Sequence, residues 1–186
     1  YAAATVRPST LTGYRRYANH YVKPYLGDKR MTQITTNDIQ KLYVKLKDEG
    51  RIHEHPEHGH QLASGTICRI HAMLHRAMKD AVQANVIPNN PTEGTVVPNP
   101  DYKPKQILND EQLECFMDAI RRDPVWYDFF YTELTTGLRR GEICGLQWQD
   151  FDAEHGTLKI SRTLHCPTVN EYITGKTKTG KGMRTI

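Results

Sequence analysis

Apolar side chains recur every three or four residues in three stretches of the first half of the chain, which is the periodicity of amphipathic helices. They predict helices over about 9–26, 35–49 and 64–86. A hydroxyl followed by an acid in Thr35–Asp38 suits a helix start, and Ser64 can cap the third helix. We therefore expect a small helical domain over residues 1–87.

The next segment is rich in proline. Half of the ten prolines fall in residues 88–104. Proline has no amide hydrogen and restricts the residue before it, so a long helix or a central strand is excluded there. We expect an extended linker over 88–106.

The pattern after the linker changes from helical spacing to alternation. Asn109 can cap a helix, Pro124 opens another, and Gly137 breaks it. Beyond Gly156 apolar and polar residues alternate, which predicts a small antiparallel sheet with strands after 156, near 169–174 and at 183–186, and a turn around 175–182. We expect a mixed α+β region over 107–186. Because the chain lacks an initial Met and stops on a predicted strand, we also expect it to be part of a longer polypeptide.

Composition narrows the class of protein. The chain has 186 residues, 38% of them hydrophobic, which is too many for a disordered chain. No apolar run approaches the roughly 18 residues of a membrane span, so a transmembrane protein is excluded. The four cysteines form no C-x-x-C pair, so we expect reduced thiols rather than a disulfide framework or a zinc ribbon.

The net charge of +4 is unevenly distributed. Residues 1–30 carry six Lys or Arg and one acid, and residues 159–186 carry the same numbers. Two basic ends suit two surfaces that face a polyanion. Two ordinary solvated surfaces are the alternative.

One string has the chemistry of a phosphate site. Residues 136–150 read TGLRRGEICGLQWQD, with two arginines between glycines at a predicted helix start. Amides at a helix start favour an anion, and a guanidinium adds a planar fork that matches two phosphate oxygens. Solvated arginines at a helix start are the alternative explanation.

This string resembles the first catalytic box of the tyrosine recombinases, the phage-type integrase family, and most closely that of integrases of conjugative transposons. The order of a helical domain, a linker, then helices and a β-hairpin is also similar, as is the stretch from Ala77–Val82 to Asn90–Pro91. The resemblance implies a SAM-like helical core-binding domain followed by the N-terminal part of a catalytic domain.

The resemblance also implies roles for the charged residues. Arg139 corresponds to the first catalytic arginine, which binds the non-bridging oxygens of the scissile phosphate. Glu142 would orient that arginine rather than act as a base. Arg140 falls at a variable position of the box, and we keep it as a candidate contact to the DNA backbone. Lys178 matches the lysine that protonates the leaving 5′ oxygen, with Lys176 as the alternative.

Other family features have no match in this sequence. These are a His/Lys-x-x-Arg block, a later His or Trp, and the nucleophilic tyrosine, so we assign the nucleophile to no residue. The implied reaction forms a 3′-phosphotyrosyl link without metal, ATP or other cofactor, in a bacterial, cytoplasmic, DNA-associated protein. The implied partners are double-stranded DNA and further protomers, as a dimer or tetramer. A DNA-binding clamp or regulator without chemistry is the alternative function, and a type IB topoisomerase or resolvase is a weaker third.

We expect further DNA contacts from basic and hydroxyl residues on the helices, the linker and the hairpin. They are Arg15, Arg16, Lys23, Ser64, Thr66, Arg69, Lys103, Lys105, Arg140, Arg162, Lys176 and Lys181. Solvent exposure without a contact is the alternative for each of them. The histidine-rich segment 51–60 could in principle bind zinc or nickel, but Pro56 and Gly59 favour a polar insertion between helices.

Overall fold

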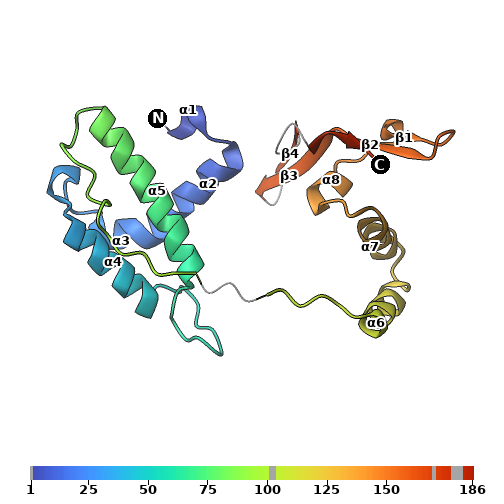
Figure 1. The fold of residues 1–186 in the computed structure, drawn as a ribbon, viewed down its shortest axis with the longest axis horizontal. Coiled ribbons are helices and arrows are strands. Elements are labelled where there is room, and N and C mark those ends of the chain that lie inside the picture. The colour runs from blue at the N-terminus through green and yellow to red at the C-terminus, as the bar shows by residue number, and fades with distance from the viewer. Residues whose placement is uncertain (1, 101–103, 169–170, 177–181) are drawn as a thin grey trace. The chain divides into compact units, whose positions relative to one another are not determined.

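The chain folds into two compact units in the computed structural model, which describes residues 2–100, 104–168, 171–176 and 182–186 (Figure 1). The first unit is Tyr1–Pro104 and the second is Lys105–Ile186. The boundary between them falls inside the predicted linker. No helix in the described ranges is long and apolar enough to cross a bilayer.

The first unit is helical. Its elements in chain order are α1 (Ala2–Thr5), α2 (Pro8–Tyr17), the π-helix η1 (Ala18–Val22), α3 (Lys23–Leu26), the 3-10 helix η2 (Met31–Gln33), α4 (Thr36–Glu49) and α5 (Ser64–Gln83). The helix predicted over 9–26 is therefore present, with a π-helical segment inside it. Pro24 has no amide hydrogen to continue an α-helical ladder, and the Lys23 amide bonds to the Ala18 carbonyl, five residues back.

The starts of α4 and α5 differ in how they are capped. Thr35 and Asp38 form the predicted capping box, in which the Asp38 amide donates to Thr35 Oγ1 at 3.2 Å and the Thr35 amide to Asp38 at 3.0 Å. At α5 the N-cap residue is Ala63, which makes no side-chain cap. The prediction that Ser64 caps this helix is wrong, because its hydroxyl instead accepts a hydrogen bond from Lys47 Nζ at 3.0 Å.

The core of the first unit lies between α4 and α5, which contact one another and run side by side in Figure 1. The buried side chains are Leu26, Ile39, Leu42, Tyr43, Leu46, Leu62, Ile67, Ile70, Met73 and Leu74. Tyr14, Tyr17 and Tyr21 cover this cluster from α2 and η1. Removing these apolar surfaces from water supplies the main stabilisation of the unit.

The first part of the proline-rich segment is attached to the helical unit. Gln40 on α4 bonds both backbone groups of Val96, at 2.8 and 3.2 Å. Cys68 on α5 donates to the Pro98 carbonyl, and Asn90 donates to the His75 carbonyl. Its described residues, 88–100 and 104, form no helix or strand, as the prolines require, and up to Pro98 they pack against the helical unit.

The second unit combines helices with short strands. Its elements are α6 (Asp110–Ile120), α7 (Pro124–Thr136), α8 (Arg140–Ile143), the 3-10 helix η3 (Trp148–Asp150), β1 (Phe151–Asp152), β2 (Thr157–Ile160), β3 (Arg162–Thr168), β4 (Glu171–Lys176) and β5 (Arg184–Thr185). Asn109 caps α6 as predicted, and Gly137 ends α7 in the left-handed conformation.

In the described residues of this unit, the strands form two small antiparallel sheets. One has the order β1-β2-β5 and the other is the hairpin β3-β4. The second predicted strand therefore begins and ends later than expected, and residues 175–176, which we placed in a turn, belong to β4. The last predicted strand forms and pairs with β2, with Lys159 opposite Thr185 and Ile160 opposite Arg184.

Candidate functional site

The arginine motif occupies the turn between α7 and α8. Gly137 has φ 63°, a conformation that is strained for a residue with a side chain, and it ends α7. Leu138 is buried, Arg139 is extended, and α8 begins at Arg140. Arg139 therefore sits at the N-cap of a short helix with its side chain outside the core.

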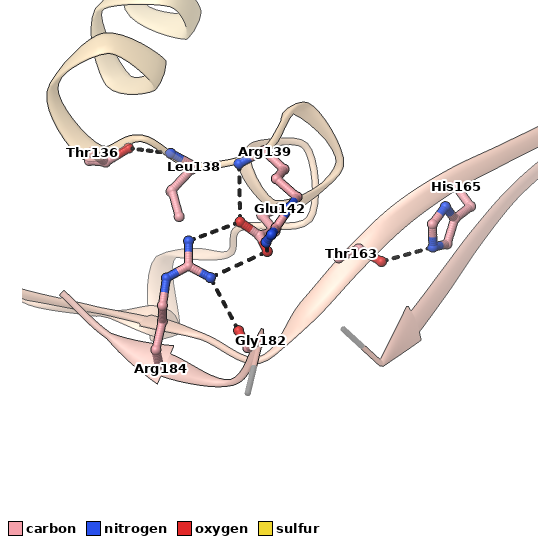
Figure 2. Close-up of polar contacts among 8 residues, drawn as sticks. All are labelled: Thr136, Leu138, Arg139, Glu142, Thr163, His165, Gly182 and Arg184. Atoms are coloured by element: carbon pink, nitrogen blue, oxygen red, sulfur yellow. Dashed lines mark hydrogen bonds and ion pairs between the residues drawn. The ribbon is translucent and has the colours of Figure 1, made fainter. Parts of the chain in front are cut away.

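Glu142 is the buried centre of this motif (Figure 2). Its Oε2 accepts the Arg139 amide at 3.0 Å, and its Oε1 accepts Arg139 Nη1 at 3.0 Å. The Glu142 side chain is 2% exposed, whereas that of Arg139 is 77% exposed. One end of the arginine is thus held by a buried carboxylate, and the rest of its guanidinium faces solvent.

Arg184 on β5 reaches the same carboxylate, a contact that no pattern in the sequence predicts. Its Nη2 donates to Glu142 Oε2 at 3.1 Å and its Nη1 to Oε1 at 3.3 Å (Figure 2). Arg184 Nη1 also donates to the Gly182 carbonyl. The two arginines are 45 positions apart, so no local pattern in the sequence joins them.

The charges around Glu142 keep it ionised. Hydrogen bonds from Arg184, opposed by burial and helped by the Arg139 amide and guanidinium, lower the pKa of Glu142 from 4.5 to about 2. A carboxylate with this pKa stays charged at neutral pH and is a poor base. Its contacts suit the orienting role expected of it, which stays a prediction.

The motif lies close against β3. A Cβ on Gly145 would lie 3.2 Å from backbone atoms of Gly141, Thr163 and Leu164, so a larger residue would require these atoms to shift. Thr163 is buried on β3, and its hydroxyl contacts His165 Nε2 at 2.9 Å (Figure 2). The turn that carries Arg139 is thus fixed by the sheet as well as by Glu142.

Of the other residues expected to act or to bind DNA near this motif, the structure describes some and not others. Arg140 is exposed beside Arg139. Lys176 is the last residue of β4, opposite Arg162 in the register. Lys178 and Lys181, as well as Lys103 on the linker, lie outside the described residues.

Arg162 is engaged by Asp150 rather than exposed for a ligand. Its Nη2 bonds Asp150 Oδ1 at 2.9 Å and its Nη1 bonds Oδ2, with the two side chains 22% and 5% exposed. Burial raises the pKa of Asp150, but the Gln147 amide and Arg162 outweigh this effect and lower it. This geometry is that of a structural ion pair, so we leave Arg162 out of the proposed DNA surface.

A pocket of about 330 Å³ on the first unit brings together residues expected to contact DNA. Arg16, Thr66 and Arg69 line it, with aromatic side chains from α2 and η1 beside them. The Arg16 guanidinium lies 5.6 Å from the Tyr17 ring centroid, a cation–π distance. The pocket therefore combines two cations, a hydroxyl and apolar walls.

The remaining residues expected to contact DNA do not line this pocket. Arg15 and Lys23 are exposed on α2 and α3, and Lys105 is exposed at the start of the second unit. Ser64 is half-buried and bonded to Lys47, which leaves its hydroxyl with a protein partner.

The histidine-rich segment forms a loop between α4 and α5. His55 bridges to Gly59, and the His55 and His58 rings stack at 4.9 Å. Within the part of the chain that the structure describes, no three His, Cys, Asp or Glu side chains come together as a metal site would require.

Comparison with known proteins shows which proteins this chain is similar to. Residues 1–47 match the family described as "Phage integrase, N-terminal SAM-like domain". The transposase from transposon Tn916 of Enterococcus faecalis is 27% identical over 183 residues, which cover 95% of this chain and 42% of the transposase. A "Tyrosine recombinase XerC-like" protein of Caldanaerobacter subterraneus is 25% identical over 170 residues, 88% of this chain and 40% of that protein.

A solved structure gives the same result for the fold. An integrase fragment of transposon Tn1549, in complex with a circular intermediate DNA, matches with a TM-score of 0.79 and 27% identity, covering 98% of this chain and 56% of that one. The predicted resemblance to tyrosine recombinases, and the predicted fold of a SAM-like helical domain followed by part of an integrase catalytic domain, are confirmed. This chain spans about two fifths of the length of the curated relatives named above.

Proposed function

We propose that this chain carries the DNA-binding domain and the first part of the active site of a tyrosine site-specific recombinase, which integrates a mobile element. The observation that carries the proposal is Arg139, a highly exposed guanidinium anchored by a buried, ionised Glu142 at a helix start. The similarity to transposon integrases, one of them solved on DNA, supports the same assignment.

Arg139 supplies electrostatic catalysis in this proposal. Its free nitrogens bind the non-bridging oxygens of the scissile phosphate, where negative charge grows as the phosphorus becomes pentacoordinate. Because Glu142 already holds the side chain, little orientational freedom is lost when the phosphate binds. A planar fork also fits two oxygens better than the single ammonium of a lysine.

The covalent step exchanges one phosphoester for another. A tyrosine hydroxyl loses its proton to solvent as its oxygen bonds to phosphorus. The bond to the 5′ oxygen breaks, and Lys178, or else Lys176, gives that oxygen its proton. The new 3′-phosphotyrosyl link conserves the phosphoester, so the reaction needs no ATP, and in this proposal it uses no metal or other cofactor. We assign the tyrosine to no residue of this sequence.

DNA binding in this proposal uses both units. On the first unit the pocket of Arg16, Thr66 and Arg69 contacts the backbone, assisted by exposed Arg15 and Lys23. On the second, Arg139, Arg140 and Lys105 face phosphates. Further protomers complete a dimer or tetramer on the element ends and the target, in the bacterial cytoplasm.

Salt-dependent binding tests this surface. Affinity for a short duplex, measured by fluorescence anisotropy, falls steeply with salt for the wild type, and the slope drops by about 0.9 for each phosphate contact removed. We expect the double variant Arg16→Ala/Arg69→Ala to lose about two such contacts. Arg121→Gln, which removes an exposed charge that pairs with Asp118 at 3.2 Å, is the matched control. An unchanged slope in the double variant would remove the pocket from the interface.

A further inference from the structure

We infer that Arg184 is a positioning residue for Arg139 and acts through the carboxylate of Glu142. This inference rests on the proposed function, since it concerns how the phosphate-binding arginine is held. Arg184 does not contact Arg139 in any described hydrogen bond. The two guanidinium groups are joined by one shared acid.

The contacts of Glu142 show how the link works (Figure 2). Each carboxylate oxygen accepts one bond from Arg139 and one from Arg184. The bidentate grip of Arg184 fixes the rotation of the carboxylate, because turning it would lengthen one of those bonds. With that rotation fixed, Oε2 points at the Arg139 amide and Oε1 at Arg139 Nη1.

The position of Arg184 is fixed by the pairing of β5 with β2. It lies on β5 opposite Ile160, which is 1% exposed. The backbones of Leu158 and Ile186 exchange hydrogen bonds of 2.8 and 3.0 Å just beyond it. The Gly182 carbonyl accepts from Arg184 Nη1 on its other side. Arg184 is thus held at both ends. Its backbone pairs with β2, and the terminal nitrogens of its guanidinium bond to Glu142 and to the Gly182 carbonyl.

The exposure of the two arginines separates their roles. The Arg184 side chain is 31% exposed and both terminal nitrogens have protein acceptors, whereas the Arg139 side chain is 77% exposed and donates with one. A phosphate therefore meets open donors on Arg139 and occupied ones on Arg184. Two cations on one carboxylate also leave a net positive charge at the site, which favours the anion.

A double-mutant cycle on DNA affinity tests the inference. The cycle compares wild type, Arg139→Ala, Arg184→Gln and the double variant, each below its own melting transition, with Arg121→Gln as a control for the loss of one charge. We expect each single variant to weaken duplex binding by about tenfold, as for one charge-assisted bond, and the double variant to lose little more. Arg184→Lys, which can reach one oxygen at a time, is expected to lie between wild type and Arg184→Gln.

Three other outcomes would each contradict the inference, for different reasons. If Arg184→Gln only lowers the melting temperature, and Arg139→Ala still costs its full tenfold in that background, Arg184 is merely structural and the inference is overturned. If the two losses multiply and the salt slope falls by two contacts, Arg184 binds phosphate itself, which also overturns it. If Arg139→Ala has no effect in the wild-type background, the proposed phosphate site fails, and the inference fails with it.

Discussion

Replacing Glu142 by glutamine removes one charge from the centre of the site while keeping the shape of the side chain. One of the two acceptor oxygens becomes an amide that faces donors. If it replaces Oε2, it meets the Arg139 amide and Arg184 Nη2; if it replaces Oε1, it meets the Nη1 atoms of both arginines. Either orientation turns two hydrogen bonds into donor–donor contacts.

The loss of folding stability in Glu142→Gln depends on which of the donors that lose a hydrogen bond can be hydrated instead. Breaking a buried ion pair from one side costs about 3–5 kcal/mol, and a hydrogen bond to a charged group contributes about 1.5–3 kcal/mol. The Arg139 side chain is mostly exposed, so solvent replaces its lost bond at little cost. Arg184 and the Arg139 amide are less accessible. We therefore expect Glu142→Gln to lower the free energy of unfolding by about 2–3 kcal/mol.

Tryptophan fluorescence during urea denaturation measures this change in the free energy of unfolding for the second unit. Both tryptophans of the sequence, Trp126 and Trp148, lie in the second unit, so the signal excludes the first. Glu114→Gln, on an exposed position of α6, is the matched control and is expected within about 0.5 kcal/mol of wild type. If Glu142→Gln also fell within that margin, Glu142 would not organise the site as described.

Two further predictions concern the second unit, and the control for the first of them, Gly13, lies on α2 of the first unit. Gly145→Ala would push a Cβ to 3.2 Å from three backbone atoms, so it is expected to lower stability by about 1–3 kcal/mol in the same denaturation assay, whereas Gly13→Ala, with nothing within 4 Å, is expected to be neutral or stabilising by circular dichroism. Lowering the pH is expected to destabilise the second unit between 4.5 and about 2. The folded state depresses the pKa of Glu142, so its stabilisation is complete above 4.5 and is lost as the carboxylate protonates. Glu142→Gln should flatten that dependence, and an equally steep loss in the variant would assign it to other groups.

Local signals in the sequence were sufficient to predict much of the fold. The capping residues Thr35 and Asn109 and the helix stop at Gly137 each depend on neighbours within a few positions, and each forms as expected. The arginine motif is also local, with Arg139 and Glu142 three residues apart, and it was recognised by its resemblance to the first box of the tyrosine recombinases.

Contacts between distant residues could not be predicted in this way. Arg184 meets Glu142 only because β5 pairs with β2 in one register, and a shift of one residue would turn its side chain to the other face. The same limit explains Arg162, whose partner Asp150 lies on another element, and Ser64, whose hydroxyl is taken by Lys47 across the α4–α5 contact.

Covalent trapping on DNA tests the central claim most directly. The full-length protein is incubated with a duplex nicked beside the recombination site, so that the cut fragment leaves and the phosphotyrosyl link persists, and the adduct is measured by denaturing electrophoresis. The account predicts an adduct for the wild type and its loss in Arg139→Ala, with duplex binding weakened by about tenfold rather than abolished. An undiminished adduct in Arg139→Ala would remove this arginine from the chemistry, and tight binding without any adduct in the wild type would make the protein a DNA clamp rather than a recombinase.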